Sequence, residues 1–119
     1  MAGWYGGPHT ELYLFPFAAF FGGLAQFLAG MWSYHARDGL ATAMHGMWGS
    51  FWMAYGVLNL LFATGTLVKP AGSFPAFAFW FIPLAAITWA GCEAAAAVNR
   101  SLMLVVLFLA AGSTAAASP

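Results

Sequence analysis

The chain has 119 residues, of which 63% are hydrophobic and only 5% are charged. Soluble domains contain roughly 25% charged residues, so this composition excludes an ordinary soluble domain and indicates a membrane protein. The formal net charge is zero and the basic residues are scattered, which leaves no electrostatic footprint for nucleic acid. We therefore expect an all-α membrane protein with a single membrane domain at residues 1–119, surrounded by membrane lipid and without a nucleic-acid partner.

The first expected span follows the N-terminal segment MAGWYGGPHTELY, which lacks the basic n-region and the cleavage site of a secretory signal. Residues 13–34 form an uncharged apolar run that reaches the length of about 20 residues needed to cross a bilayer. The polar sequence HARDG then ends this helix, and Gly39 suits a turn into the next one. We expect this first helix to be retained.

Three further helices are expected at residues 40–64, 75–97 and 101–117, which gives about four transmembrane helices. The loop TGTLVKPAGSFP separates the second from the third, and Pro75 suits the first turn of a helix because its missing N–H needs no partner there. Arg37 and Arg100 fall in loops on one side of the membrane and Lys69 on the other. The positive-inside rule places the two arginine loops in the cytoplasm and the N-terminus outside.

Small residues form one stripe on each of the first two helices. Gly22, Gln26 and Gly30 recur every four residues on the first, and a similar stripe follows on the second. Such stripes let helix backbones approach closely, which drives association in lipid. The residues expected to pack helices together are Gly22, Gly23, Gly30, Gly46, Gly49 and Gly56. In a lone four-helix chain these stripes would face lipid, so we expect a multimer or association with a homologue.

Polar groups within the first two helices suggest a path for a solute. The Gln26 amide would be costly against hydrocarbon, so it either bonds to a neighbouring helix or lines a solute route. The second helix carries aromatic side chains with N–H and O–H donors at helical spacing, a pattern that fits either packing or a pathway. The candidate substrate path comprises Gln26, Trp48, Ser50, Trp52, Tyr55 and Asn59.

The favoured interpretation of the sequence involves no catalysis, metal or cofactor. Cys92 stands alone, so neither an internal disulfide nor a Cys/His metal spacing is available. His9, His35 and His45 raise the alternative of a haem- or quinone-linked membrane subunit. Only His45 is expected at membrane depth, where it either couples transport to protons or forms a plain hydrogen bond near the interface.

The segments FFGGLAQFLAGMWSY and TAMHGMWGSFWMAYG resemble the second and third helices of the acetate uptake transporters, or succinate-acetate permeases. That family reads approximately F-Y-G-G-x-A-Q-x-x-A-G-x-x-E-Y and then T-A-F-x-S-Y-G-x-F-W, with matching spacing between the two motifs. The matching residues are Gly22, Gly23, Ala25, Gln26, Ala29, Gly30, Tyr34, Gly49, Phe51 and Trp52. The later helices resemble the family's fourth and fifth helices only in general character.

Several positions depart from the family pattern. Phe21 and Trp48 stand where the family has tyrosine, Ser33 replaces a glutamate, and His45 replaces a phenylalanine. The family's first helix, with its Asn-Pro-x-Pro-x-Gly-Leu motif, and its sixth helix have no counterpart. These departures keep open a truncated, non-transporting remnant or an accessory subunit.

By resemblance, the function is uptake of a small carboxylate such as acetate or succinate, by a channel-like or proton-coupled route. The resemblance also implies part of a six-helix transporter-like bundle that assembles into a homo-oligomer, often a hexamer, in the plasma (inner) membrane. Because no Lys or Arg lies within an expected span, the anion would depend on neutral donors.

Overall fold

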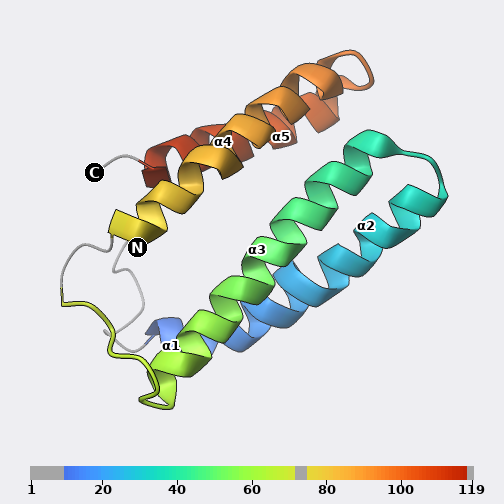
Figure 1. Ribbon diagram of the computed structural model, residues 1–119. Coiled ribbons are helices and arrows are strands. Elements are labelled where there is room, and N and C mark those ends of the chain that lie inside the picture. The colour runs from blue at the N-terminus through green and yellow to red at the C-terminus, as the bar shows by residue number, and fades with distance from the viewer. Residues whose placement is uncertain (1–9, 72–74, 118–119) are drawn as a thin grey trace. The chain divides into compact units, whose positions relative to one another are not determined.

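The computed structural model describes residues 10–71 and 75–117, and these contain helices and no strand (Figure 1). The chain divides into two compact units, Met1–Lys69 and Pro70–Pro119. Each unit is built around a pair of packed helices. The predicted all-α class is confirmed. The N-terminal segment with His9 lies outside the described residues.

The first unit is a hairpin of two long helical rods (Figure 1). The first rod is continuous and consists of α1 (Thr10–Phe17), a π-helix η1 (Ala18–Ala25) and α2 (Gln26–His35); the second rod is α3 (Gly39–Ala63). Pro16 lies in α1, two residues before the π-helix begins at Ala18. Proline removes one backbone donor and crowds the turn before it, so it locally interrupts the α-helical hydrogen bonding of α1.

The turn between α2 and α3 is fixed by its backbone. Asp38 N–H donates to the Ser33 carbonyl and Arg37 N–H to the Tyr34 carbonyl, both at 3.0 Å, in the pattern of a Schellman motif. Arg37 has a φ of 62°, the left-handed region usually occupied by glycine. For a residue with a Cβ this conformation costs roughly 1–2 kcal/mol. Asp38 then caps α3 by accepting a hydrogen bond from Ala41 N–H at 2.9 Å.

Glycines allow the two rods to touch backbone to backbone. A Cβ placed on Gly49 would lie 2.6 Å from the Phe27 nitrogen, and one on Gly30 would lie 2.9 Å from the Gly46 nitrogen. A Cβ on Gly23 would lie 2.9 Å from the Met53 nitrogen. The two small-residue stripes therefore face each other within the hairpin. The expectation that they would face lipid in a lone chain is wrong, and assembly must be argued from other surfaces.

The second unit is the hairpin of α4 (Pro75–Ala96) and α5 (Arg100–Ala117) (Figure 1). Small and short side chains fill the seam between them. Ala95 and Ala110 are fully buried, as is Thr88, whose hydroxyl donates to the Leu84 carbonyl at 2.6 Å. Asn99 begins α5 by accepting from Ser101 N–H at 2.7 Å, as an N-cap does.

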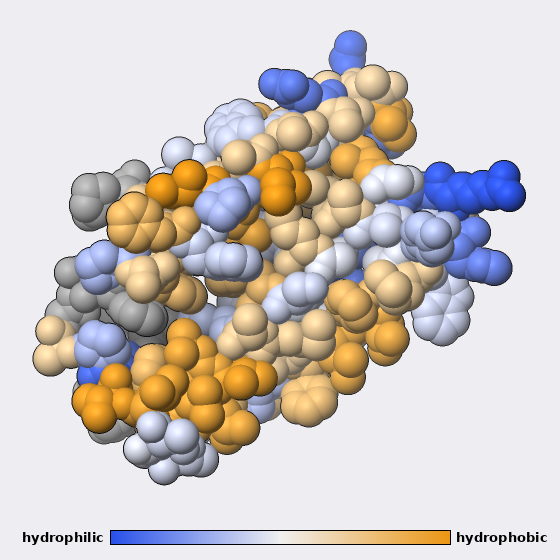
Figure 2. All heavy atoms as spheres, viewed as in Figure 1, coloured by the Kyte–Doolittle hydropathy of each residue, from blue (hydrophilic) through white to orange (hydrophobic). Residues whose placement is uncertain are grey.

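Many large apolar side chains are exposed on both units, and apolar residues occupy much of the face shown in Figure 2. Phe21 is 83% exposed and Phe108 75%, an arrangement suited to lipid as the solvent. Three helical stretches are long and apolar enough to cross a membrane, namely Leu12–His35, Pro75–Ala96 and Arg100–Ala117. The fourth expected span, α3, has 25 residues and is long enough, but it is not among these three stretches.

The glycine contacts predict a contrast between two substitutions on α3. Gly49→Ala should push the rods apart, since its new methyl group meets backbone, and should lower stability by about 1–3 kcal/mol. Gly46→Ala is the matched control, because nothing lies within 4 Å of its added Cβ. Thermal unfolding in mild detergent should show loss for Gly49→Ala alone. Equal losses would contradict the packing.

Candidate solute path along the first hairpin

Four aromatic side chains form a continuous row along α3. Trp48 and Phe51 meet edge to face with ring centroids 5.6 Å apart, and Phe51 meets Trp52 in the same way at 5.1 Å. Trp52 in turn lies 5.8 Å from Tyr55. Such edge-on contacts hold each ring in a defined orientation. Phe51 was missing from the predicted path, although its place beside Trp52 in the family motif was a signal.

Two buried polar atoms near the start of this row have no hydrogen-bond partner among the described residues. They are His45 Nδ1 and Trp48 Nε1, and the Trp48 side chain is only 5% exposed. The two residues are three apart on a helix, so they share a face. An unpaired buried polar group costs about 1–3 kcal/mol, and native proteins rarely leave one without a purpose. Both atoms are therefore suited to a solute or water.

Gln26 is the first residue of α2, directly after the π-helix, and is half-buried. One turn before it, Gly22 faces Trp52, and one turn after it, Gly30 faces Gly46. This antiparallel register puts Gln26 at the level of Gly49, beside Trp48 in the sequence of α3. Within the part of the chain that the structure describes, the Gln26 amide makes no hydrogen bond.

The remaining predicted path residues differ in their surroundings. Tyr55 and Trp52 belong to the aromatic row and are half-buried. Asn59 lies one turn beyond Tyr55, is 4% exposed, and donates from Nδ2 to the Tyr55 carbonyl at 2.9 Å. Ser50 is exposed, and its hydroxyl donates to the Gly46 carbonyl at 2.7 Å. The structure thus places Ser50 apart from the buried polar groups.

A second set of polar side chains, which the sequence reasoning missed, lies between α4 and α5. Trp89 Nε1 donates to Thr114 Oγ1 at 3.0 Å, and Ser113 Oγ donates to the Leu109 carbonyl at 2.9 Å. The sequence feature that could have revealed these residues is the presence of Thr and Ser in otherwise apolar helices. The Trp89–Thr114 bond joins the two helices, whereas the Ser113 hydroxyl bonds within α5, so neither donor is unpaired.

The histidines and the cysteine of the described ranges 10–71 and 75–117 do not gather into a metal-binding cluster. No group of three or more His, Cys, Asp or Glu side chains in them could hold a metal ion. Cys92 is buried, and its thiol lies 3.7 Å from the Met103 carbonyl oxygen as a weak donor. His35 is exposed at the end of α2.

Apolar helices of membrane-spanning length define an integral membrane protein. The chain matches the GPR1/FUN34/yaaH family over residues 6–117, and therefore belongs to that family, the acetate and succinate permeases. This confirms the resemblance drawn from the two glycine-rich motifs. The family is one of transporters rather than enzymes.

Similarity to individual proteins is more limited. A stretch of 38 residues is 47% identical to the meiotically up-regulated gene 86 protein of Schizosaccharomyces pombe. It covers 32% of this chain and 12% of that relative. No solved structure matches the chain.

The unpaired indole predicts an unusual response to Trp48→Phe. This change removes the Nε1 donor and keeps an aromatic ring, so the protein no longer buries an unsatisfied group. The free energy of unfolding in detergent should stay the same or rise by up to about 1 kcal/mol. Removal of the unpaired donor stabilises the protein, and the smaller volume of phenylalanine offsets part of this gain. Thermal unfolding of both proteins measures this. A clear loss of stability would indicate that the N–H is bonded in the folded protein.

Proposed function

We propose that this protein carries a small carboxylate, such as acetate or succinate, across the membrane along the first hairpin. The observation that carries the proposal is the pair of unpaired buried atoms, His45 Nδ1 and Trp48 Nε1. Trp48 precedes Gly49, which lies at the level of Gln26, and His45 lies one turn away, opposite Gly30. Trp48 Nε1 is a donor, and His45 Nδ1 can donate or accept according to its tautomer. Together with the Gln26 amide they supply the hydrogen bonds that a carboxylate loses on leaving water.

The proposed path holds its solute with neutral groups. Residues 12–36 and 39–68 contain no Lys, Arg, Asp or Glu, so no fixed charge binds the anion tightly. Neutral donors bind weakly, and weak binding suits passage because a path must also release its solute. A proton that travels with the carboxylate would lower its desolvation cost further. The route is accordingly channel-like or proton-coupled.

The proposed setting is the plasma (inner) membrane, with several copies of the chain in a ring such as a hexamer. Exposed aromatic and aliphatic side chains occur on both units, and they support contacts with lipid or with further copies of the chain (Figure 2). Arg37 lies in the turn between α2 and α3, which the positive-inside rule assigns to the cytoplasmic side.

Gln26→Ala tests the path directly. If the amide lines the path, the substitution should lower uptake of labelled acetate about tenfold per folded molecule, which corresponds to one lost hydrogen bond to a charged group of ~1.4 kcal/mol. The amount of folded protein should not change, because the amide makes no hydrogen bond within the described residues. Uptake normalised to folded protein is the measurement.

Ser50→Ala is the matched control for Gln26→Ala, because the Ser50 hydroxyl is exposed and already bonded to the Gly46 carbonyl. It should leave uptake unchanged, whereas Trp48→Phe should lower it. If Gln26 instead joins helices, Gln26→Ala should lower thermal stability by about 0.6–2 kcal/mol, and uptake should fall only with the protein lost. Unchanged uptake per folded molecule in Gln26→Ala would contradict the proposal that Gln26 lines the path.

The second candidate function is that of an accessory subunit that acts only beside a longer homologue. The observation that favours it is the departure from the family pattern at Ser33, where the family has glutamate, and at His45, where it has phenylalanine. Liposomes that contain only this chain separate the two functions. Acetate uptake by these liposomes supports the transporter, and uptake that requires a co-reconstituted homologue supports the accessory subunit.

A further inference from the structure

The turn between α2 and α3 carries two hollows that share one wall. The larger, of about 630 Å³, is lined by Tyr34, His35, Arg37, Gly39, Thr42 and Ala43. The smaller, of about 310 Å³, is lined by Met31, Trp32 and His35. His35 belongs to both linings, so the two hollows are neighbours. Neither includes a residue of the proposed solute path.

The larger hollow presents cationic and donor groups without a competing acid in its lining. Arg37 is exposed and makes no ion pair with any residue that the structure describes. Asp38 follows it in sequence, but its carboxylate caps Ala41 N–H at 2.9 Å and is not part of the lining. The Tyr34 hydroxyl and the His35 ring add further donors. This set fits an anion, and the planar guanidinium fits a phosphate or carboxylate with two parallel hydrogen bonds.

The backbone of Arg37 supports a role for its side chain. The residue occupies a left-handed conformation, with a φ of 62°, where glycine would be unstrained. The hydrogen bonds from Arg37 N–H to Tyr34 and from Asp38 N–H to Ser33 hold this conformation. A strained residue that surrounding bonds enforce often serves a site. Here the enforced backbone conformation holds the base of the Arg37 side chain at the wall of the larger hollow.

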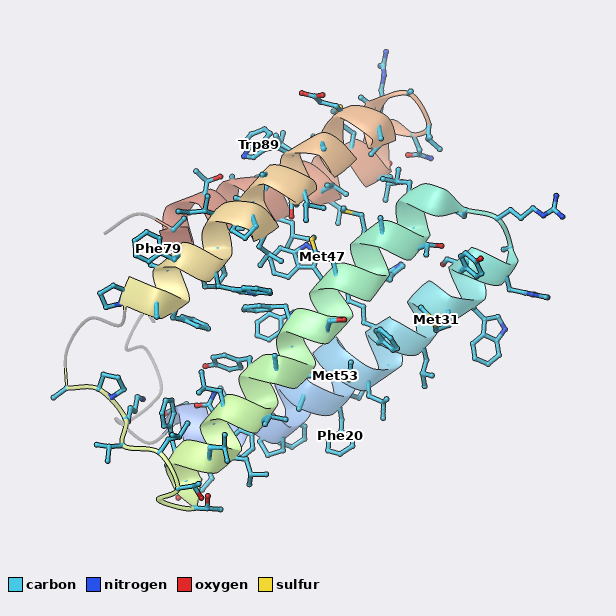
Figure 3. All side chains as sticks on the ribbon, viewed as in Figure 1. Phe20, Met31, Met47, Met53, Phe79 and Trp89 are labelled. Atoms are coloured by element: carbon cyan, nitrogen blue, oxygen red, sulfur yellow. The ribbon has the colours of Figure 1, made fainter. Side chains whose placement is uncertain are left out.

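The smaller hollow is apolar and faces outward. Trp32 is 74% exposed and Met31 44%, and Figure 3 shows Met31 on the α2 rod near the turn. Tryptophan is enriched where a bilayer meets water. An apolar hollow beside a cationic one matches a molecule with a charged head and a hydrocarbon tail. A free phosphate or a short carboxylate would leave the apolar hollow unused.

We propose that this turn binds an anionic phospholipid. Its phosphate lies against Arg37, Tyr34 and His35, and the start of an acyl chain lies over Met31 and Trp32. Anionic lipids are abundant in the cytoplasmic leaflet, where basic groups next to a span bind them. The site is separate from the proposed transport path, so it does not depend on that function.

The test uses the full chain purified in mild detergent, with thermal unfolding followed as phosphatidylglycerol or phosphatidylcholine is added. Phosphatidylglycerol should raise the unfolding temperature of the unaltered protein more than phosphatidylcholine does. Arg37→Gly should raise the unfolding temperature without lipid, because it relieves the left-handed strain. The same variant should bind phosphatidylglycerol about fivefold more weakly, the effect expected from one basic group at an anionic surface.

Arg100→Gln is the matched control, since it removes a basic residue at the other hairpin turn and should keep the phosphatidylglycerol response. Trp32→Ala should weaken phospholipid binding and leave any response to inorganic phosphate unchanged. An equal response in Arg37→Gly and the unaltered protein would overturn the proposal, as would an equal loss in Arg100→Gln. A rise with inorganic phosphate or succinate as large as that with phosphatidylglycerol would also overturn it, because the site would then bind free anions.

Discussion

The backbone contact between the first rod and α3 is the constraint on which the rest of this hairpin depends. In lipid, apolar side chains gain little by leaving their solvent, so helices associate where small residues let their backbones meet. Gly23, Gly30 and Gly49 provide that contact at successive levels. Each fixes which residues of the two rods lie at the same depth. This register sets the depth of Gln26 relative to Trp48, because the Gln26 amide makes no hydrogen bond within the described residues.

The π-helix adjusts the rod to this register. Each π-type bond spans one more residue than an α-type bond, so η1 changes the direction in which later side chains point. Gly22 lies within η1 and Gly30 within α2, so the four-residue stripe read from the sequence crosses two kinds of helix. Gln26 stands at their junction. π-type segments inside α-helices occur frequently at functional sites.

Sequence reasoning reached the elements and the family but not the pairing of faces. Uncharged runs bounded by Arg37, Lys69 and Arg100 were enough to predict the helices, because bilayer thickness sets their length. Periodicity identified the glycine stripes, yet it cannot say which helix a stripe meets, and here the stripes meet each other. The unpaired atoms of His45 and Trp48 were also beyond prediction, since pairing depends on neighbours in space. Arg37 was read only as a loop charge because no pattern reveals a left-handed backbone.

The placement of charge suggests different roles for the turn and for the membrane-spanning part of the first hairpin. The span of the first hairpin has only neutral polar groups, whereas Arg37 lies outside it, in the turn. A cation held in the span would bind a carboxylate too firmly to release it, and it would be costly without a partner. A phospholipid on Arg37 would cancel the cation at the turn, so that residue would anchor the hairpin and would not collect carboxylates. Choice among solutes would then rest on the donors of Gln26 and Trp48 and on the aromatic row, and therefore on size and hydrogen bonding instead of on charge attraction.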